Sequence, residues 1–135
     1  METAVLSKRI GLYLFNLFLY LGIGFGGSLP FLLLLHLHVV YYLLISMGIT
    51  IAFSFLFDFF LICVTKGFNI GSAIFGVKYV SINNDIISAK QAFIRSSSES
   101  IPIFVIFDFL YFLRYRTERG VIDRLSGTFA IDIRR

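Results

Sequence analysis

The hydrophobic and polar positions of this chain divide it into two unequal parts. From Ile10 to Phe57, 48 residues pass without an Asp, Glu, Lys or Arg, and most of them are Leu, Phe, Ile, Val, Tyr or Gly. One helical crossing of the hydrocarbon core needs about 20 apolar residues, so this stretch is long enough for two crossings. A small soluble core could not bury so much apolar surface. The pattern predicts an integral membrane protein with transmembrane helices over residues 8–28 and 41–64.

The segment between these two helices is predicted to be an outer, interfacial connection over residues 31–40. Residues 10–64 exceed two crossings by about ten residues, which leaves that length for the connection. His36 and His38 fall in it. Residues two positions apart share a side only in an extended segment, and no Cys or acidic residue is close in sequence. We therefore expect neutral interfacial histidines and no metal site.

A cluster of glycines precedes this connection and has two interpretations. Gly22 and Gly26 form a small-x-x-x-small pair that would seat a neighbouring helix. Alternatively, the cluster and the following Pro30 simply mark the end of the first helix.

Polar residues return after Gly67, and shorter elements are expected there. A β-branched stretch predicts a cytoplasmic strand and turn over residues 76–85. Ser88 is a good helix cap, so a helix is expected over residues 88–113, with Pro102 able to begin a new one. The alternation in residues 127–133 predicts a C-terminal strand that would pair with the first.

The third apolar segment, residues 101–113, is short for a full crossing. Thirteen helical residues extend about 20 Å, whereas the hydrocarbon core is about 30 Å thick. A re-entrant or interfacial helix therefore fits better than a third span, although a three-span arrangement stays open. The expected fold is mainly α, with two transmembrane helices, this third helix and a small cytoplasmic β pairing.

The distribution of basic residues supports the two-span arrangement. The net charge is +4, and the apolar run has basic residues only at its ends and beyond. Cytoplasmic flanks of membrane helices carry the excess of Lys and Arg, so both termini are expected in the cytoplasm. Basic residues beside membrane segments usually face anionic lipid, and we expect a lipid partner and no nucleic acid. The residues that would share this side are Lys8, Arg9, Lys66, Arg95 and those of the tail from Arg114 onward.

Catalytic and cofactor motifs are not found in the sequence. The single Cys63 excludes an intrachain disulfide and a Cys-rich metal site. The chain has no nucleophile turn, Walker loop or HExxH motif. We therefore expect a protein that is not an enzyme and that needs no cofactor.

The tail carries a motif that resembles the closing signature of the RDD family, small prokaryotic membrane proteins named for one Arg and two Asp. The similar residues are Asp123-Arg124-Leu125 and Gly127-Thr128, preceded by the basic Arg119. The glycine-rich segment 65–71, the strand after it and Arg95 are also similar to family positions. Arg9 resembles the family's Arg near the start of the first helix. The resemblance covers nearly the whole chain and implies one membrane domain over residues 1–135, in the inner membrane of a prokaryotic cell.

Two positions depart from the family pattern. The family's first Asp, seven residues after Arg9, is Asn16 here, and a relay that depends on a carboxylate at that place is put in doubt. Ser72 and Ala73 stand where many members carry a Lys-Arg pair, which weakens a phosphate or lipid-headgroup role for that loop.

The family implies two classes of function. Cation/proton exchange is attributed to some members, so the protein is expected to be transport-related, as an exchanger or a subunit of a transporter. The alternative is a non-transporting scaffold, assembly factor or immunity-type accessory subunit of a larger membrane complex. Two spans are expected to enclose no cavity in a monomer, so transport would require a homo-oligomer or a partner membrane protein.

The candidate residues can serve either class. Arg9 and Asp123 could pair and tie the tail to the first helix. Alternatively, carboxylates at membrane depth could carry protons, and Asp108, with apolar neighbours on both sides, is the preferred one. The family-signature polar residues are Arg9, Asn16, Arg95, Asp123 and Thr128, and the candidate intramembrane carboxylates are Asp58 and Asp108.

Overall fold

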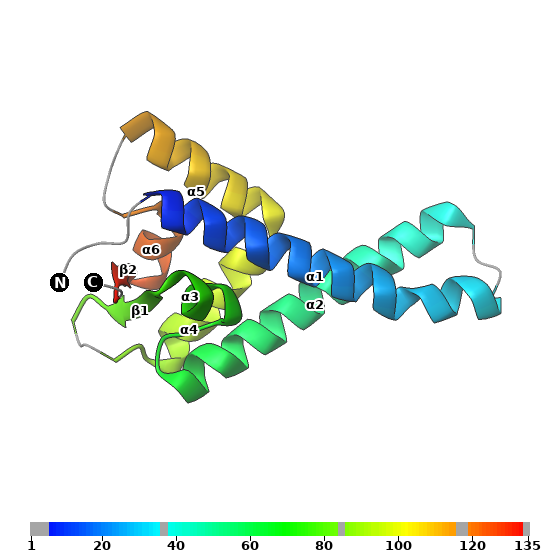
Figure 1. The fold of residues 1–135 in the computed structure, drawn as a ribbon, viewed down its shortest axis with the longest axis horizontal. Helices are drawn as coiled ribbons and strands as arrows, with labels where there is room; N and C mark the ends of the chain where they lie inside the picture. Colours follow the sequence, from blue (N-terminus) through cyan, green and yellow to red (C-terminus); the bar gives the residue numbers. More distant parts are fainter. Residues whose placement is uncertain (1–5, 36–37, 84–85, 116–118, 134–135) are drawn as a thin grey trace.

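Two long helices form an antiparallel hairpin, and all other elements gather at one end of it (Figure 1). The computed structural model describes residues 6–35, 38–83, 86–115 and 119–133. The hairpin consists of α1 (Leu6–Leu35) and α2 (Val39–Thr65). Both are long and apolar enough to cross a membrane, as the sequence predicts. We call the end where α1 begins and α2 ends the polar end.

Both long helices exceed their predicted bounds of 8–28 and 41–64, α1 by seven residues at its C-terminal end, and the predicted ten-residue connection is wrong. The helix α1 continues past its glycines and contains Pro30. Unwound backbone facing lipid would leave its polar groups without hydrogen bonds, whereas a proline inside a membrane helix is tolerated. His36 lies outside the described residues. His38 is the exposed, extended N-cap of α2 and not part of a long interfacial segment.

Close contact between the two helices depends on Gly24, not on the predicted pair Gly22 and Gly26. A Cβ at Gly24 would lie 1.7 Å from the Thr50 hydroxyl oxygen, whereas Gly22 and Gly26 have nothing within 4 Å of that position. Small residues in membrane helices allow such approach. Further along the hairpin, the buried hydroxyls of Ser28 and Ser46 are hydrogen-bonded to each other.

A two-stranded sheet lies at the polar end. The strands β1 (Val77–Ser81) and β2 (Thr128–Asp132) are antiparallel and pair from Val77 opposite Asp132 to Ser81 opposite Thr128. The pairing predicted for residues 76–82 and 127–133 is therefore confirmed. The turn predicted to follow β1 falls largely on residues 84–85, outside the described residues.

Two short helices at this end are absent from the predicted layout. The helix α3 (Ile70–Phe75) begins with a capping box in which the side chains of Asn69 and Ser72 each bond the other's backbone. The helix α6 (Val121–Ser126) precedes β2 and ends at Gly127, whose φ of 64° lies in the left-handed region that favours glycine.

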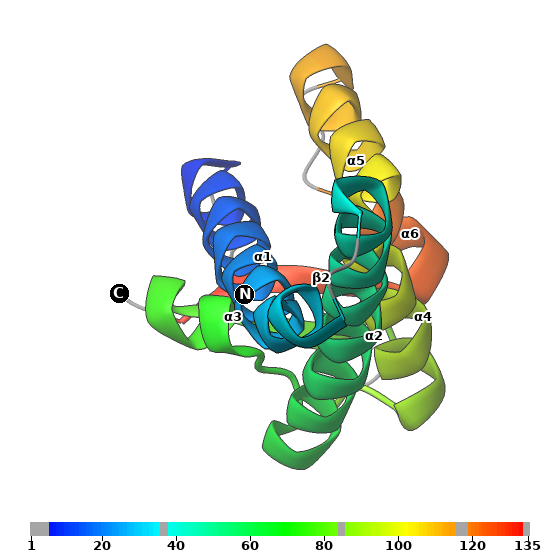
Figure 2. The ribbon, with the colours of Figure 1, turned by 90° about the vertical axis from the view of Figure 1, so that its right-hand side faces the viewer.

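The helix predicted over residues 88–113 is two helices, α4 (Ala89–Ser100) and α5 (Pro102–Tyr115), with a bend of 93° between them. Ser88 and Gln91 form the capping box of α4, and Pro102 begins α5, as its sequence position allows. Figure 2 shows α5 rising away from α4. A bent pair of this length is either one broken span or a re-entrant loop.

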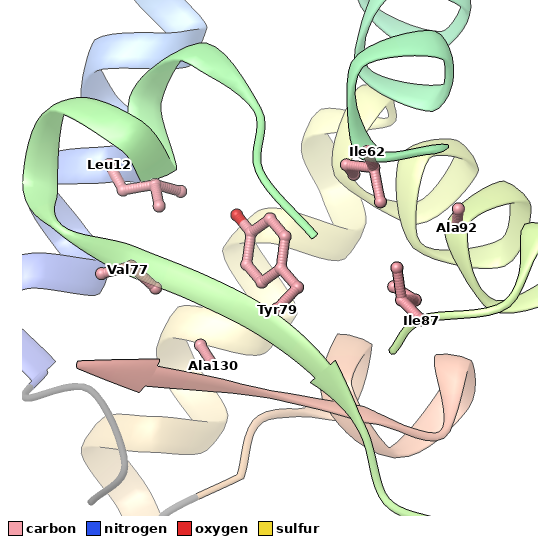
Figure 3. Packing of buried hydrophobic residues seen from close by; sticks show 7 residues of the cluster. All are labelled: Leu12, Ile62, Val77, Tyr79, Ile87, Ala92 and Ala130. Atoms are coloured by element: carbon pink, nitrogen blue, oxygen red, sulfur yellow. The ribbon is translucent and has the colours of Figure 1, made fainter. Parts of the chain in front are cut away.

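The core sits where α1 and α2 diverge at the polar end and surround the sheet. Figure 3 shows the Tyr79 ring among side chains from five elements and the segment before α4. Burial of a Leu, Ile or Val side chain stabilises the fold by about 1.5–3 kcal/mol relative to its exposure. The buried cluster contains Leu12, Ile62, Val77, Tyr79, Ile87, Ala92 and Ala130.

Candidate functional site

Asp123 of α6 binds two arginines from distant parts of the chain. Arg9 of α1 donates to its Oδ2 at 2.5 Å, and Arg95 of α4 donates to its Oδ1 at 2.7 Å. The same terminal nitrogen of Arg95 also donates to the Thr128 hydroxyl at 2.8 Å. We call these four residues the arginine clasp. The sequence-predicted contact between Arg9 and Asp123 is present, and Arg95 and Thr128 join it.

The clasp is buried and flanked by aromatic rings. Arg9, Arg95 and Asp123 are each at most 2% exposed. The Arg95 guanidinium lies 3.6 Å from the centroid of the Tyr79 ring, and that of Arg9 lies 4.9 Å from the centroid of Phe112. Stacking on an aromatic ring stabilises a desolvated guanidinium. The clasp therefore ties α1, α4, α6 and β2 together.

The electrostatics of the clasp keep Asp123 ionised. Burial alone would raise the pKa of this carboxyl, but the charges of Arg95 and Arg9 more than offset that and lower its pKa below the usual 3.8. Arg95 also forms an ion pair with Glu99 one turn along α4, at 2.9 Å. Two guanidinium groups thus balance two buried carboxylates.

Asp108 is held by groups from two neighbouring elements. Its carboxylate accepts from the Ile122 backbone N–H at 2.9 Å and from the Tyr13 hydroxyl at 3.0 Å. A Cβ on Gly120 would lie 2.2 Å from its Oδ1. Asp108 is fully buried and joins α5 to α1 and to the start of α6. These contacts make Asp108 a structural anchor. Its apolar sequence neighbours predict that it is enclosed but not that it has these hydrogen-bonding partners.

Asn16 occupies the family's first Asp position and has a local role in this chain. Its side-chain oxygen accepts from the Gly71 backbone N–H at 3.1 Å, near the start of α3. A Cβ on Gly71 would lie 2.4 Å from that oxygen. Asn16 is not part of the clasp; it docks α3 against α1.

Asp58 lies apart from the clasp, beside a cavity between α1, α2 and the bend of α4 and α5. It is 2% exposed, and its Oδ1 accepts a hydrogen bond from Tyr20 at 2.5 Å. The cavity has a volume of about 170 Å³ and is walled mostly by apolar side chains. The helices α4 and α5 supply part of its wall, so the two long helices alone do not form it. The apolar walls include Leu17, Leu21, Met47, Ile51, Val105 and Ile106.

Glu99 also lines this cavity, and the sequence analysis did not single it out. It lies in the serine-rich end of α4, and its side chain is only 4% exposed. Glu99 is paired with Arg95, whereas no ion pair joins Asp58 or Asp108 to a Lys or Arg within the described residues. Asp108 has an amide and a hydroxyl as partners. Asp58 is therefore a buried carboxyl that lines a cavity and that has no cationic partner in the described part of the chain.

The apolar hairpin, the bent helix pair and the clasp define a small helical membrane protein with a buried cluster of charged residues at one end. The chain belongs to the RDD family, whose model it matches over residues 3–127. Neither the curated proteins nor the solved structures contain a significant match to it. The match covers every residue of the clasp except Thr128.

Proposed function

We propose that the protein exchanges a cation for a proton across the membrane and that Asp58 carries the exchange. The observation that supports this proposal is the position of Asp58, buried beside a cavity and bonded to Tyr20 but to no cationic side chain among the described residues. Ionisable residues within membrane segments are rare and usually functional. The protein is, on this proposal, a transporter and not an enzyme.

The chemistry of the step follows from the surroundings of Asp58. An ionised carboxylate in an apolar cavity is unfavourable unless something neutralises it. A proton or a bound cation can each do so, but both together would leave an excess positive charge. Entry of one therefore favours departure of the other. The Tyr20 hydroxyl donates to Asp58 and so stabilises its charged form between the two states.

Asp58 is a better candidate for this step than Asp108. The two hydrogen bonds of Asp108 join α5 to two other elements, and α6 approaches it too closely at Gly120 for a side chain to fit there. A change of charge at Asp108 would disturb that packing. Asp58 has open space beside it and can change charge without moving a helix.

The proposed topology places the polar end in the cytoplasm of a prokaryotic cell. Lys8 contacts Asp132 at this end, so the start of α1 and the end of β2 lie on the same side. The clasp and the basic tail lie there as well, as the positive-inside bias requires. The cavity beside Asp58 does not reach across the long hairpin, and a second copy or a partner membrane protein would complete the path.

Exchange can be measured with purified protein in liposomes under a gradient of a monovalent cation, with sodium, potassium and an organic ammonium ion each tested in turn and a pH-sensitive dye inside. Wild-type protein should move protons in the direction opposite to the flow of the cation, and Asp58→Asn should abolish that proton movement. Asp132→Asn is the matched control because it removes a carboxylate far from the cavity. Exchange that survives Asp58→Asn, or folded wild-type protein that moves no protons, would contradict the proposal.

A second candidate function is that of a scaffold or accessory subunit. It is favoured by the open glycines of the hairpin, Gly22, Gly26, Gly27 and Gly48, which contact nothing within 4 Å of a Cβ position. Small residues let another membrane helix approach closely. Co-purification of one partner in mild detergent, lost when Gly26 is replaced by Leu, would favour this function over transport.

A further inference from the structure

The cavity has a polar end and an apolar body. Its polar lining residues include Asp58, Glu99 and Tyr20, together with Tyr13, Asn16 and Ser100, and most of the remaining surface is apolar. The hydroxyls of Thr50 and Ser54 at its edge already donate to backbone carbonyl oxygens of α2. The volume of about 170 Å³ is close to that of engineered apolar cavities of about 150 Å³ that bind benzene.

We propose that this cavity binds a small amphipathic ammonium ion, with its amine at Asp58 and its apolar body against Leu17, Ile51 and Val105. The inference rests on the proposed function in that it names the class of cation that Asp58 exchanges. An ammonium group matches an unpaired carboxylate in charge and in hydrogen bonding. An apolar body of up to benzene size replaces water from aliphatic walls, which is favourable.

A bare metal ion fits these walls poorly. Hard cations require several oxygen ligands to replace their hydration shell. In the described residues no group of three or more His, Cys, Asp or Glu side chains could hold a metal ion, and most of the surface that lines the cavity is carbon. An ion there would lose more solvation than the site returns. An organic ammonium ion carries a smaller polar surface and brings its own apolar surface.

The charge balance of the exchange is simple. The ammonium ion enters with one positive charge, forms hydrogen bonds to the Asp58 carboxylate, and one proton leaves Asp58 for solvent. No covalent bond forms other than the O–H bond when the proton returns. Glu99 stays paired with Arg95 throughout, at 2.9 Å, so the arginine clasp is not disturbed.

The test uses three molecules of nearly one shape and different charge: benzylamine, benzyl alcohol and benzoate. Binding is measured by equilibrium dialysis against the full chain in zwitterionic nanodiscs, with empty nanodiscs to subtract partition into lipid. Benzylamine should bind at least tenfold more tightly than benzyl alcohol, and benzoate should not bind. Each benzylamine bound should release about one proton into a weakly buffered solution.

Two variants separate the polar end from the apolar body. Asp58→Asn should abolish the preference for benzylamine over benzyl alcohol while leaving weak binding of both. Val105→Phe should fill the cavity and weaken the binding of both benzylamine and benzyl alcohol. Asp132→Asn should change neither affinity. Circular dichroism and elution volume in detergent confirm that each variant is folded.

Equal affinity for benzylamine and benzyl alcohol in the wild-type protein would overturn the inference, and so would a tenfold preference that survives Asp58→Asn. Tight, Asp58-dependent binding of sodium without binding of benzylamine would overturn it in favour of a metal-ion site. Charge-selective binding with no proton exchange in liposomes would overturn the proposed function and leave this binding site standing.

Discussion

Arg9 and Asp123, which are 114 positions apart in the sequence, are joined by a buried hydrogen bond of 2.5 Å between their charged groups. The first helix and the last short helix are thereby fixed to each other. Both side chains are at most 3% exposed, so water does not screen the contact.

Removal of either partner should destabilise the fold. A buried ion pair broken on one side leaves an uncompensated charge and costs about 3–5 kcal/mol. Arg9→Ala and Asp123→Ala should each lower the thermal midpoint in detergent and the yield of folded protein. The double variant should be less damaging than the sum of the two, because it leaves neither of these charges without its counterpart. Strictly additive losses would show that the residues do not interact in solution.

The contribution of the clasp to the stability of the fold should decrease at acid pH. The pKa of Asp123 is lowered below 3.8 by its arginines despite its burial, so the folded state binds fewer protons than the unfolded state in that region. The stabilisation is complete above the unfolded value and is lost as pH falls through the folded one. The difference in thermal midpoint between wild type and Asp123→Asn should therefore be constant from pH 7 to pH 5 and shrink toward pH 3. A difference that is the same at pH 3 would argue against an ionised Asp123.

Asp108 should behave as an anchor. Asp108→Ala removes the acceptor of a buried backbone N–H and should cost about 1.5–3 kcal/mol. Tyr13→Phe removes only one of its two hydrogen bonds and should cost less, about 0.5–1.5 kcal/mol. Chemical denaturation in mixed micelles measures both. A fully stable Asp108→Ala that has lost proton exchange would instead return Asp108 to the role of proton carrier.

The hairpin contact should tolerate a methyl group at some glycines and not at others. Gly24→Ala places a Cβ 2.9 Å from the Ser46 carbonyl oxygen, which is backbone and cannot rotate away. We expect a loss of about 1–3 kcal/mol from overpacking. Gly26→Ala is the matched control, and it should be neutral or stabilise the helix by up to about 1 kcal/mol. Equal effects at both positions would mean that α1 and α2 cross elsewhere.

Topology can be tested with single cysteines at exposed positions. In a Cys63→Ser background, His38→Cys lies at the connection of the hairpin and Lys90→Cys lies at the polar end, and both positions are exposed. An impermeant thiol reagent added to intact cells should label position 38 and not position 90. Labelling of position 90 from outside would refute cytoplasmic termini.

Part of this fold is readable from sequence because it follows from strong local patterns. The uncharged run of 48 residues predicts both long helices, and the alternation after Gly127 predicts β2. The pairing of Arg9 with Asp123 is predicted from the family signature, and no local pattern would have supplied it. The end of α1 is mispredicted because glycine and Pro30 break helices in water more readily than in lipid.

The cavity and Glu99 were beyond sequence reasoning for a different reason. The end of α4 is polar in composition, which usually indicates exposure. Ser98 and Ser100 are nevertheless buried, because each hydroxyl donates to a carbonyl oxygen of the preceding turn and so needs no water. The cavity itself depends on the 93° bend between α4 and α5, a long-range feature that no spacing of residues reveals.

The length of chain between Arg9 and Asp123 has a consequence for biosynthesis. Ribosomes make Arg9 first, and both long helices can enter the membrane before Asp123 and Arg95 have left the exit tunnel. For that whole interval the guanidinium group of Arg9 must remain at the water interface, since long-range contacts form only after the intervening loop closes. Elements that are synthesised after both long helices therefore complete the surroundings of α1, and a nascent chain cut short before α6 would keep its two spans but lack the contact that fixes them at the polar end.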